Sequence, residues 1–211
     1  MKYRGIVKIA AVIGLAASAW WWNPWRSIKH PPGVLVRTAP EQRDLKPGPL
    51  PSVKGWNLVA VADYRLTARV LGVKRYYSGF GSDLVPIDVA VGWGRMSDQA
   101  VLDQFAISMG NRFFFYEWAD EPAIPTDEIM RSAANNHVIA ANDDVRKTIA
   151  SLIPGHIVTM RGYLVNASDS EGGKWNSSLR RDDTGNGACE IFFVQEASIV
   201  EPPAGELVAA K

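Results

Sequence analysis

The sequence predicts an α+β protein: a strongly curved antiparallel sheet of barrel-like, OB-like form, with about two helices on one side, preceded by one N-terminal transmembrane helix. Three observations predict this fold class: an uncharged apolar run near the start, two helical stripes in the middle, and period-two alternation through the last third. The chain has 211 residues, of which 47% are hydrophobic and 21% are charged. This composition is typical of a globular protein of one domain and excludes collagen-like and fully disordered chains.

Residues 1–25 predict a membrane anchor. Three basic residues occur within the first eight positions, and residues 9–22 then run for 14 positions without a charge. Residues 17–19 (Ala-Ser-Ala) offer a signal-cleavage pattern, but three tryptophans follow at 20–22, and tryptophan prefers the membrane–water interface. We therefore expect an uncleaved anchor, with a buried or surface helix of a soluble protein as the alternative.

The orientation of the anchor follows from the flanking charges. Basic residues precede the apolar run, but Arg26 and Lys29 follow it closely, so the bias toward a cytoplasmic N-terminus is small. This bias predicts a single-pass protein of the inner membrane with its soluble domain in the periplasm.

The segment 26–51 predicts an extended spacer. Residues 30–51 contain six prolines and two glycines without a helical period. We expect this spacer to hold a soluble domain, residues 52–202, away from the bilayer, and residues 203–211 to form a flexible tail.

The first half of the body predicts strands followed by a helix. Residues 58–62 and 64–71 read as one bent strand or two short ones, and 76–82 as an aromatic, turn-rich loop. Ser97 or Asp98 predicts the N-cap of a helix over 98–109 that ends at Gly110, because apolar residues recur there with helical spacing. The aromatic run 112–118 then predicts a buried strand.

The second half predicts one more helix among strands. Asn142 is expected to cap a helix that begins with two acidic residues, which suit the positive end of a helix dipole. The Gly- and Asn-rich stretch 182–187 predicts a hairpin loop. The remaining expected elements are a helical turn at 127–132 and strands at 137–140, 157–165, 175–180, 189–194 and 197–200.

Charge and cysteine content exclude several classes of protein. Outside the first 30 residues, 18 basic side chains stand against 22 acidic ones, which argues against a nucleic-acid binder. The single cysteine excludes an internal disulfide and a Cys-rich zinc site. The three histidines, His30, His137 and His156, do not lie at ligand spacing, so we expect no metal and no cofactor.

Two motifs carry a resemblance. They are Gly-Trp-Gly-Arg-Met-Ser-Asp at 92–98 and Ser-Ser-Leu-Arg-Arg-Asp-Asp-Thr-Gly-Asn-Gly-Ala-Cys-Glu at 177–190. Together with the basic, apolar N-terminus they resemble uncharacterised membrane-anchored proteins of Gram-negative bacteria. That group has no known activity, so the resemblance implies no functional residue.

The candidates for catalysis are few, because the chain lacks a Walker loop, a dinucleotide fingerprint, HExxH and G-x-S-x-G. Cys189 with His137 is the sharpest enzymatic hypothesis, with Asn135, Asn136 or Asp182 as the group that orients the imidazole. Ser178 (or its neighbour Ser177) with His137 is the second. Cysteine in a strand more often behaves as a small buried apolar residue, and serine beside a turn more often bonds to backbone.

A candidate binding surface lies on the strand expected at 175–180. Trp175, Ser178, Arg180 and Asp182 could share one sheet face and together hold a sugar, peptide or carboxylate. The alternative is a core tryptophan beside a local ion pair. Trp93, between two glycines, is a second binding candidate or a tight entry into the next helix.

These features predict a non-enzymatic, membrane-anchored protein whose periplasmic domain binds another envelope protein or a cell-envelope ligand. The first alternative is a hydrolase or transferase that uses Cys189 or Ser178 with His137. The second is an OB-like nucleic-acid binder, which needs a basic groove. That groove would be lined by Arg65, Arg69, Arg161 and Arg180.

Overall fold

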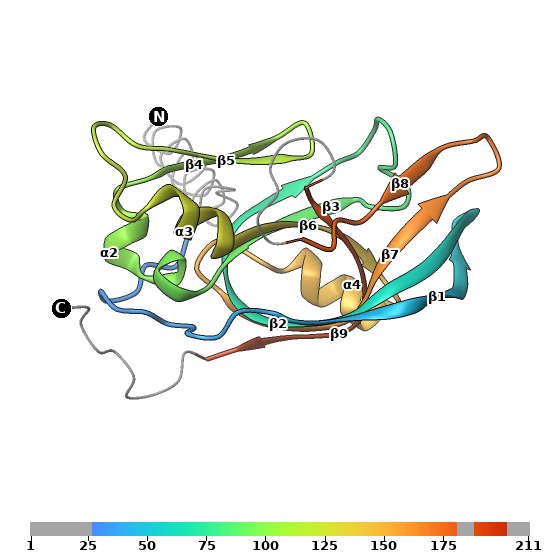
Figure 1. The fold of residues 1–211 in the computed structure, drawn as a ribbon, viewed down its shortest axis with the longest axis horizontal. Coiled ribbons are helices and arrows are strands. Elements are labelled where there is room, and N and C mark those ends of the chain that lie inside the picture. The colour runs from blue at the N-terminus through green and yellow to red at the C-terminus, as the bar shows by residue number, and fades with distance from the viewer. Residues whose placement is uncertain (1–26, 181–187, 202–211) are drawn as a thin grey trace, which may run out of the picture.

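The computed structural model describes residues 27–180 and 188–201, and its main element is a seven-stranded sheet in the order β1-β2-β3-β6-β9-β7-β8 (Figure 1). The predicted anchor therefore lies outside the described residues. Within the described part, no helix is long and apolar enough to cross a membrane. The strands of this sheet are β1 (Glu41–Val53), β2 (Trp56–Arg75), β3 (Ile87–Gly92), β6 (Ala133–Ala140), β7 (Ile157–Ser168), β8 (Lys174–Asn176) and β9 (Glu190–Val200).

Five of these strands pair in a closed ring, which we call the barrel. The long strand β2 bends so that its first part pairs with β7 and its last part, from Arg69 onward, pairs with β3. The ring then continues through β6, β9 and back to β7. The β6–β9 pair is parallel and the other pairs are antiparallel. The predicted class, a mixed α+β protein with a large curved sheet, is confirmed.

The barrel interior is filled by alternate residues of its strands. Tyr64 and Phe192 are fully buried there, and their rings meet edge to face with centroids 4.8 Å apart. Helix α4 (Asp143–Ala150) contributes Val145 and Ile149 to the same core. The predicted cap of α4 is confirmed, because Asn142 Oδ1 accepts the Val145 N–H at 2.9 Å.

Most of the predicted spacer is part of the folded domain. From Ile28 onward the chain packs on the domain, since Ile28 N donates to Pro154 O at 2.8 Å, and Leu35 and Val36 are buried in the core. Its last part is strand β1, which pairs with the first part of β2. Strand β1 tolerates prolines because it is an edge strand, where a missing N–H need not break a ladder. The extended conformation was predictable, but the boundary expected at residue 52 does not match the fold.

An insertion between β3 and β6 departs most from the sequence prediction. The helix expected over 98–109 ends at Leu102, although Asp98 Oδ1 does cap it by accepting the Ala100 N–H at 2.9 Å. Residues from Ala106 onward instead form a hairpin, because pairing with the following aromatic strand satisfies their backbone groups. The insertion consists of the 3-10 helix η1 (Gly94–Ser97), α2 (Gln99–Leu102), β4 (Ala106–Gly110), β5 (Phe113–Glu117) and α3 (Thr126–Arg131).

The hairpin β4–β5 forms a second, two-stranded sheet that lies across the outside of the barrel (Figure 1). The aromatic strand expected at 112–118 is present, but it is not buried throughout. Phe114 and Tyr116 pack inward on an apolar cluster, whereas Phe115 is 45% exposed. The reason is that only one face of a two-stranded sheet can lie against the barrel.

Candidate binding site

The tip of the inserted hairpin is fastened to the barrel by one arginine. Asn111 and Arg112 make the two-residue turn, and both have positive φ, at 51° and 69°. Such a turn matches the twist of the strands, but its second position favours glycine. Arg112 is held there by its side chain, whose Nη1 donates to Asp88 Oδ1 at 3.0 Å and to Val85 O at 2.9 Å.

Asp88 and His137 form the buried centre of this contact. They are directly opposite each other on β3 and β6, and His137 Nδ1 lies 2.8 Å from Asp88 Oδ1. Asp88 is fully buried, and His137 is 2% exposed. One carboxylate oxygen therefore joins the imidazole of a barrel strand to the guanidinium of the inserted hairpin. We call Asp88, Arg112 and His137 the polar cluster.

Aromatic rings enclose the polar cluster. The Arg112 guanidinium lies 3.8 Å from the centre of the Tyr76 ring and 5.2 Å from that of Trp175 on β8. The Trp175 ring also covers His137, with centroids 4.7 Å apart. Gly81 makes room for the indole, because a Cβ there would fall 2.5 Å from Trp175 Cζ3. Burial raises the pKa of Tyr76, and the negative charge of Asp88 raises it further.

The two nucleophile candidates have different surroundings. Cys189 Sγ is 3.8 Å from Asn135 Nδ2 on β6 and 3.8 Å from Arg112 O at the hairpin tip. Ser178 Oγ accepts the Arg180 N–H at 3.0 Å, which is a local turn contact. Among the described residues, no hydrogen bond joins His137 to either side chain, and the imidazole is covered by Trp175.

The residues of the predicted binding surface do not lie together on one face of the sheet. The strand expected at 175–180 ends at Asn176, so Trp175 lies in the sheet, whereas Arg180 is exposed in the loop that follows. Asp182 lies outside the described residues. Trp93 is 3% exposed and belongs to the barrel core, so it is not a surface residue. The sequence thus identifies Trp175 and His137 separately, and the structure brings these two together.

Asp88, Arg112 and Tyr76 are not among the residues predicted from the sequence. A weak signal existed for Asp88, which is a charged residue inside an apolar strand. A second signal was Gly110 and Asn111 between two runs of apolar residues, since glycine and asparagine favour turns. No local pattern could link Arg112 to Asp88, because their contact depends on how the insertion folds back.

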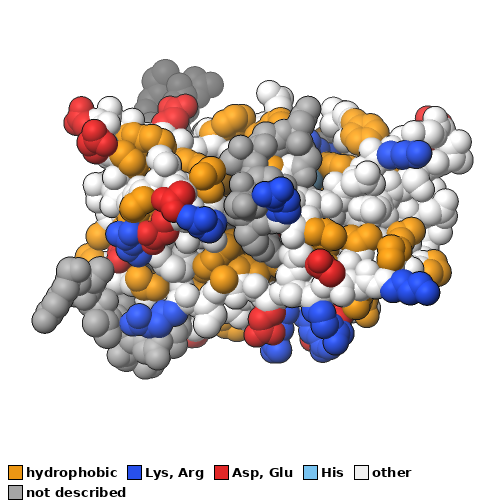
Figure 2. Space-filling model, viewed as in Figure 1, with side chains coloured by type: hydrophobic (Ala, Val, Ile, Leu, Met, Phe, Trp, Pro, Cys, Tyr) orange, Lys and Arg blue, Asp and Glu red, His pale blue; other side chains and the backbone are white. Residues whose placement is uncertain are grey.

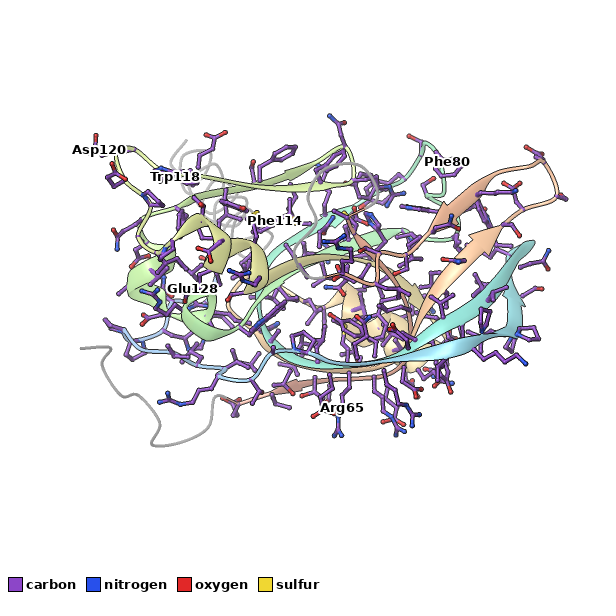
Figure 3. All side chains as sticks on the ribbon, in the orientation of Figure 1. Arg65, Phe80, Phe114, Trp118, Asp120 and Glu128 are labelled. Carbon is purple, nitrogen blue, oxygen red and sulfur yellow. The ribbon has the colours of Figure 1, made fainter. Side chains whose placement is uncertain are left out.

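One of the four arginines proposed for a nucleic-acid groove is buried. Arg69 is 3% exposed and donates to Ser97 O at 3.0 Å and to Gln99 Oε1. Burial lowers the pKa of Arg69 to about 10. Arg65 and Arg161 are exposed and directly opposite each other on β2 and β7. Figure 3 shows Arg65 on the side of the molecule away from the inserted hairpin.

A groove of about 440 Å³ lies between the inserted hairpin and the barrel. Its walls are β5, helix α3 and the start of β6, and Asn135 and Cys189 line the end nearest the polar cluster. Apolar side chains form most of this surface. The polar cluster fixes one wall of the groove, because Arg112 holds the hairpin tip to β3. The groove lining is Phe113, Phe114, Phe115, Tyr116, Glu117, Ile129, Met130, Ala133, Ala134, Asn135, Ala188 and Cys189.

The positive φ of Asn111 in the hairpin turn can be tested by substitution. Replacing Asn111 with alanine should destabilise the protein by about 1 kcal/mol, because alanine lacks the tolerance of asparagine for positive φ. Asn111→Gly should be close to neutral. Urea unfolding of the full chain, followed by circular dichroism, measures both. Equal stability of the two variants would contradict the assigned turn.

The remaining histidines do not form a metal site. His30 Nε2 lies 2.7 Å from Gly155 O, and His156 Nδ1 accepts the Ile153 N–H at 3.3 Å. In the part of the chain that the structure describes, no group of three or more His, Cys, Asp or Glu residues could hold a metal ion.

His156 predicts a pH dependence of stability. Burial lowers the pKa of His156 below its model-peptide value of 6.5. As the pH falls through 6.5, the unfolded chain takes up a proton before the folded one, so the free energy of unfolding should fall until the lower folded-state pKa is passed. His156→Asn should remove this part of the acid sensitivity. Melting temperatures of both proteins between pH 7.5 and 5 test it, and parallel curves would contradict it.

Comparison of the chain with protein-family models, with curated proteins and with solved structures gives no match.

Proposed function

We propose that the chain is a single-pass protein of the inner membrane whose periplasmic domain is an OB-like module that binds another envelope protein. The strand order supports the OB-like assignment. Numbered along the chain, the five barrel strands follow the ring order 1-2-3-5-4, with strands three and five parallel. Helix α4 lies between strands three and four. This arrangement supports a Greek-key barrel of the OB type.

One observation carries the binding function: an apolar groove whose aromatic wall reaches solvent. Phe115 of the groove is 45% exposed on β5, and Trp118, which follows this strand outside the groove lining, is 36% exposed. Large apolar side chains that remain exposed around a groove mark surfaces that bind other proteins. Figure 2 shows apolar side chains gathered over this side of the molecule.

The enzymatic alternative has less support. His137 and Asp88 have the geometry of an acid–base pair, but the imidazole is buried under Trp175, where no substrate could reach it. The contacts of His137 and Arg112 instead fix the hairpin that forms the groove. We assign these residues a positioning role.

The membrane part of the proposal rests on residues 1–25, with their basic start and uncharged run. A membrane-impermeant maleimide tests it. In a Cys189→Ser background, Glu171→Cys places a thiol at an exposed position, and intact cells are then treated. Labelling of a membrane-bound, uncleaved chain is the expected result. Protection until lysis would place the domain in the cytosol and contradict the proposal.

Photo-crosslinking in intact cells tests the binding function. A benzoylphenylalanine at Phe115 should give a discrete adduct with an envelope protein. The same group at Lys147, which is exposed on α4, should not. Adducts from both positions, or from neither, would count against this groove as a binding site.

A further inference from the structure

We propose that the groove binds a basic, extended segment of the partner protein, which adds as a strand to the free edge of β5. This inference rests on the proposed function, because it names the kind of segment that the protein-binding groove takes.

The first argument is the backbone of β5. This strand pairs with β4 alone, with Gly110 opposite Phe113 next to the turn. In such a hairpin the closing pair exchanges hydrogen bonds, and every second pair after it does the same. The backbone groups of Phe114 and Tyr116 therefore point away from β4. Among the described residues, no strand pairs with this second edge.

The second argument is the opposite wall of the groove. Strand β9 pairs with β6 only from Asn136 onward, so the edge of β6 before that residue has no strand partner in the described part. The groove thus runs between two strand edges, and Ile129 and Met130 of α3 contribute apolar surface. An extended peptide presents backbone groups at its edges and side chains on alternate faces, which matches this lining.

The third argument is Asn135, at the end of the groove nearest the polar cluster. Its Nδ2 donates to Arg112 O at 3.0 Å. Its Oδ1 is buried and has no hydrogen-bond partner among the described residues. A buried amide oxygen without a donor is costly, and an N–H of an added strand would satisfy it.

The fourth argument is charge, which selects a basic segment. Residues 113–128 contain five acidic side chains and no lysine or arginine. Two of them, Asp127 and Glu128, are paired with arginines. Within the described ranges no ion pair involves the other three, Glu117, Asp120 and Glu121.

The figures place these acids beside the aromatic wall. Figure 3 shows Trp118 and Asp120 near the end of the hairpin away from its tip, and Figure 2 shows carboxylates beside apolar side chains in the same corner. A segment that alternates basic and apolar residues would meet both kinds of surface.

The experiment uses the full chain in detergent and fluorescein-labelled synthetic peptides, with binding followed by fluorescence anisotropy. The first peptide alternates Lys and Val over eight residues. The second alternates Glu and Val. The third is the Lys–Val peptide with N-methyl groups on alternate residues, which removes the donors from one edge. We expect the Lys–Val peptide to bind, and the other two to bind at least about tenfold more weakly.

A matched pair of variants locates the site. Glu117→Gln, Asp120→Asn and Glu121→Gln together should weaken binding of the Lys–Val peptide by about tenfold. Asp143→Asn, Asp144→Asn and Glu171→Gln together remove the same number of exposed charges elsewhere and should leave it unchanged.

The outcomes separate this inference from the proposed function. Equal binding of the plain and N-methylated peptides would overturn strand addition, and equal loss in the two triple variants would overturn the site. Crosslinking from Phe115 to an envelope protein, without any binding of the Lys–Val peptide, would retain the binding function and reject the basic segment. Absence of both would reject both.

Discussion

Replacing Asp88 with alanine is expected to lower the free energy of unfolding by about 3–5 kcal/mol, because it leaves Arg112 and the buried His137 without their shared acceptor. For a domain of this size the melting temperature should fall by about 6–20 °C. Thermal unfolding of the full chain, followed by circular dichroism, measures the effect. Hydrogen exchange of residues 113–117 should also become faster, since the hairpin tip loses its attachment to β3.

Two further variants show whether the effect belongs to the polar cluster. Asp144→Ala removes an exposed carboxylate that lies 3.4 Å from Lys147 Nζ, and it should change stability by less than about 0.5 kcal/mol. Adding Arg112→Met to Asp88→Ala should cost at least about 0.5 kcal/mol less than the sum of the single variants. Strict additivity would show that the two residues are not coupled.

Replacing Gly162 with alanine is expected to cost about 3 kcal/mol, at the upper end for an added methyl group in a packed core. Gly162 lies where β7 pairs with both β2 and β9, and a Cβ there would overlap Phe193 O. The clash is with backbone, so it can be relieved only by opening the β7–β9 pair.

Gly110 provides the matched control for this substitution. It is also a strand glycine, but no atom lies within 4 Å of an added Cβ. Gly110→Ala should be neutral or stabilise the protein by up to about 1 kcal/mol. Urea unfolding of the two variants gives the comparison. If both glycines tolerate alanine equally, the close approach of β7 and β9 at Gly162 is wrong.

The elements that could be predicted from the sequence are those with local signals. Asn142 before two acidic residues predicted the start of α4, and the alternation from Ile157 predicted β7. The prediction of a helix over 98–109 was wrong because Phe105 and Met109 can pack on the same apolar cluster from either a helix or a hairpin. Pairing between β4 and β5 decided the outcome, and it has no signature in the 98–109 window.

The candidate site could be predicted only in part, for a related reason. His137 and Trp175 stand out as residue types, but their contact depends on closure of the ring of strands. The groove depends on the inserted hairpin folding back onto β6. The aromatic wall of the groove was predicted as a core strand, because a run of apolar residues does not reveal whether one or both faces of the strand are buried.

The prolines of β1 affect whether other proteins can pair with this edge of the sheet in the periplasm, where we propose that the domain lies. Pro49 lies opposite Val59 in the paired part of β1, whereas Pro47 and Pro51 lie where the register between β1 and β2 shifts. A proline has no N–H to donate, and prolines and register shifts both make an edge strand a poor template for a further strand. Copies of the chain are therefore protected against stacking edge to edge through β1. The edge of β1 is therefore a less favourable place for an added strand than β5, which contains no proline.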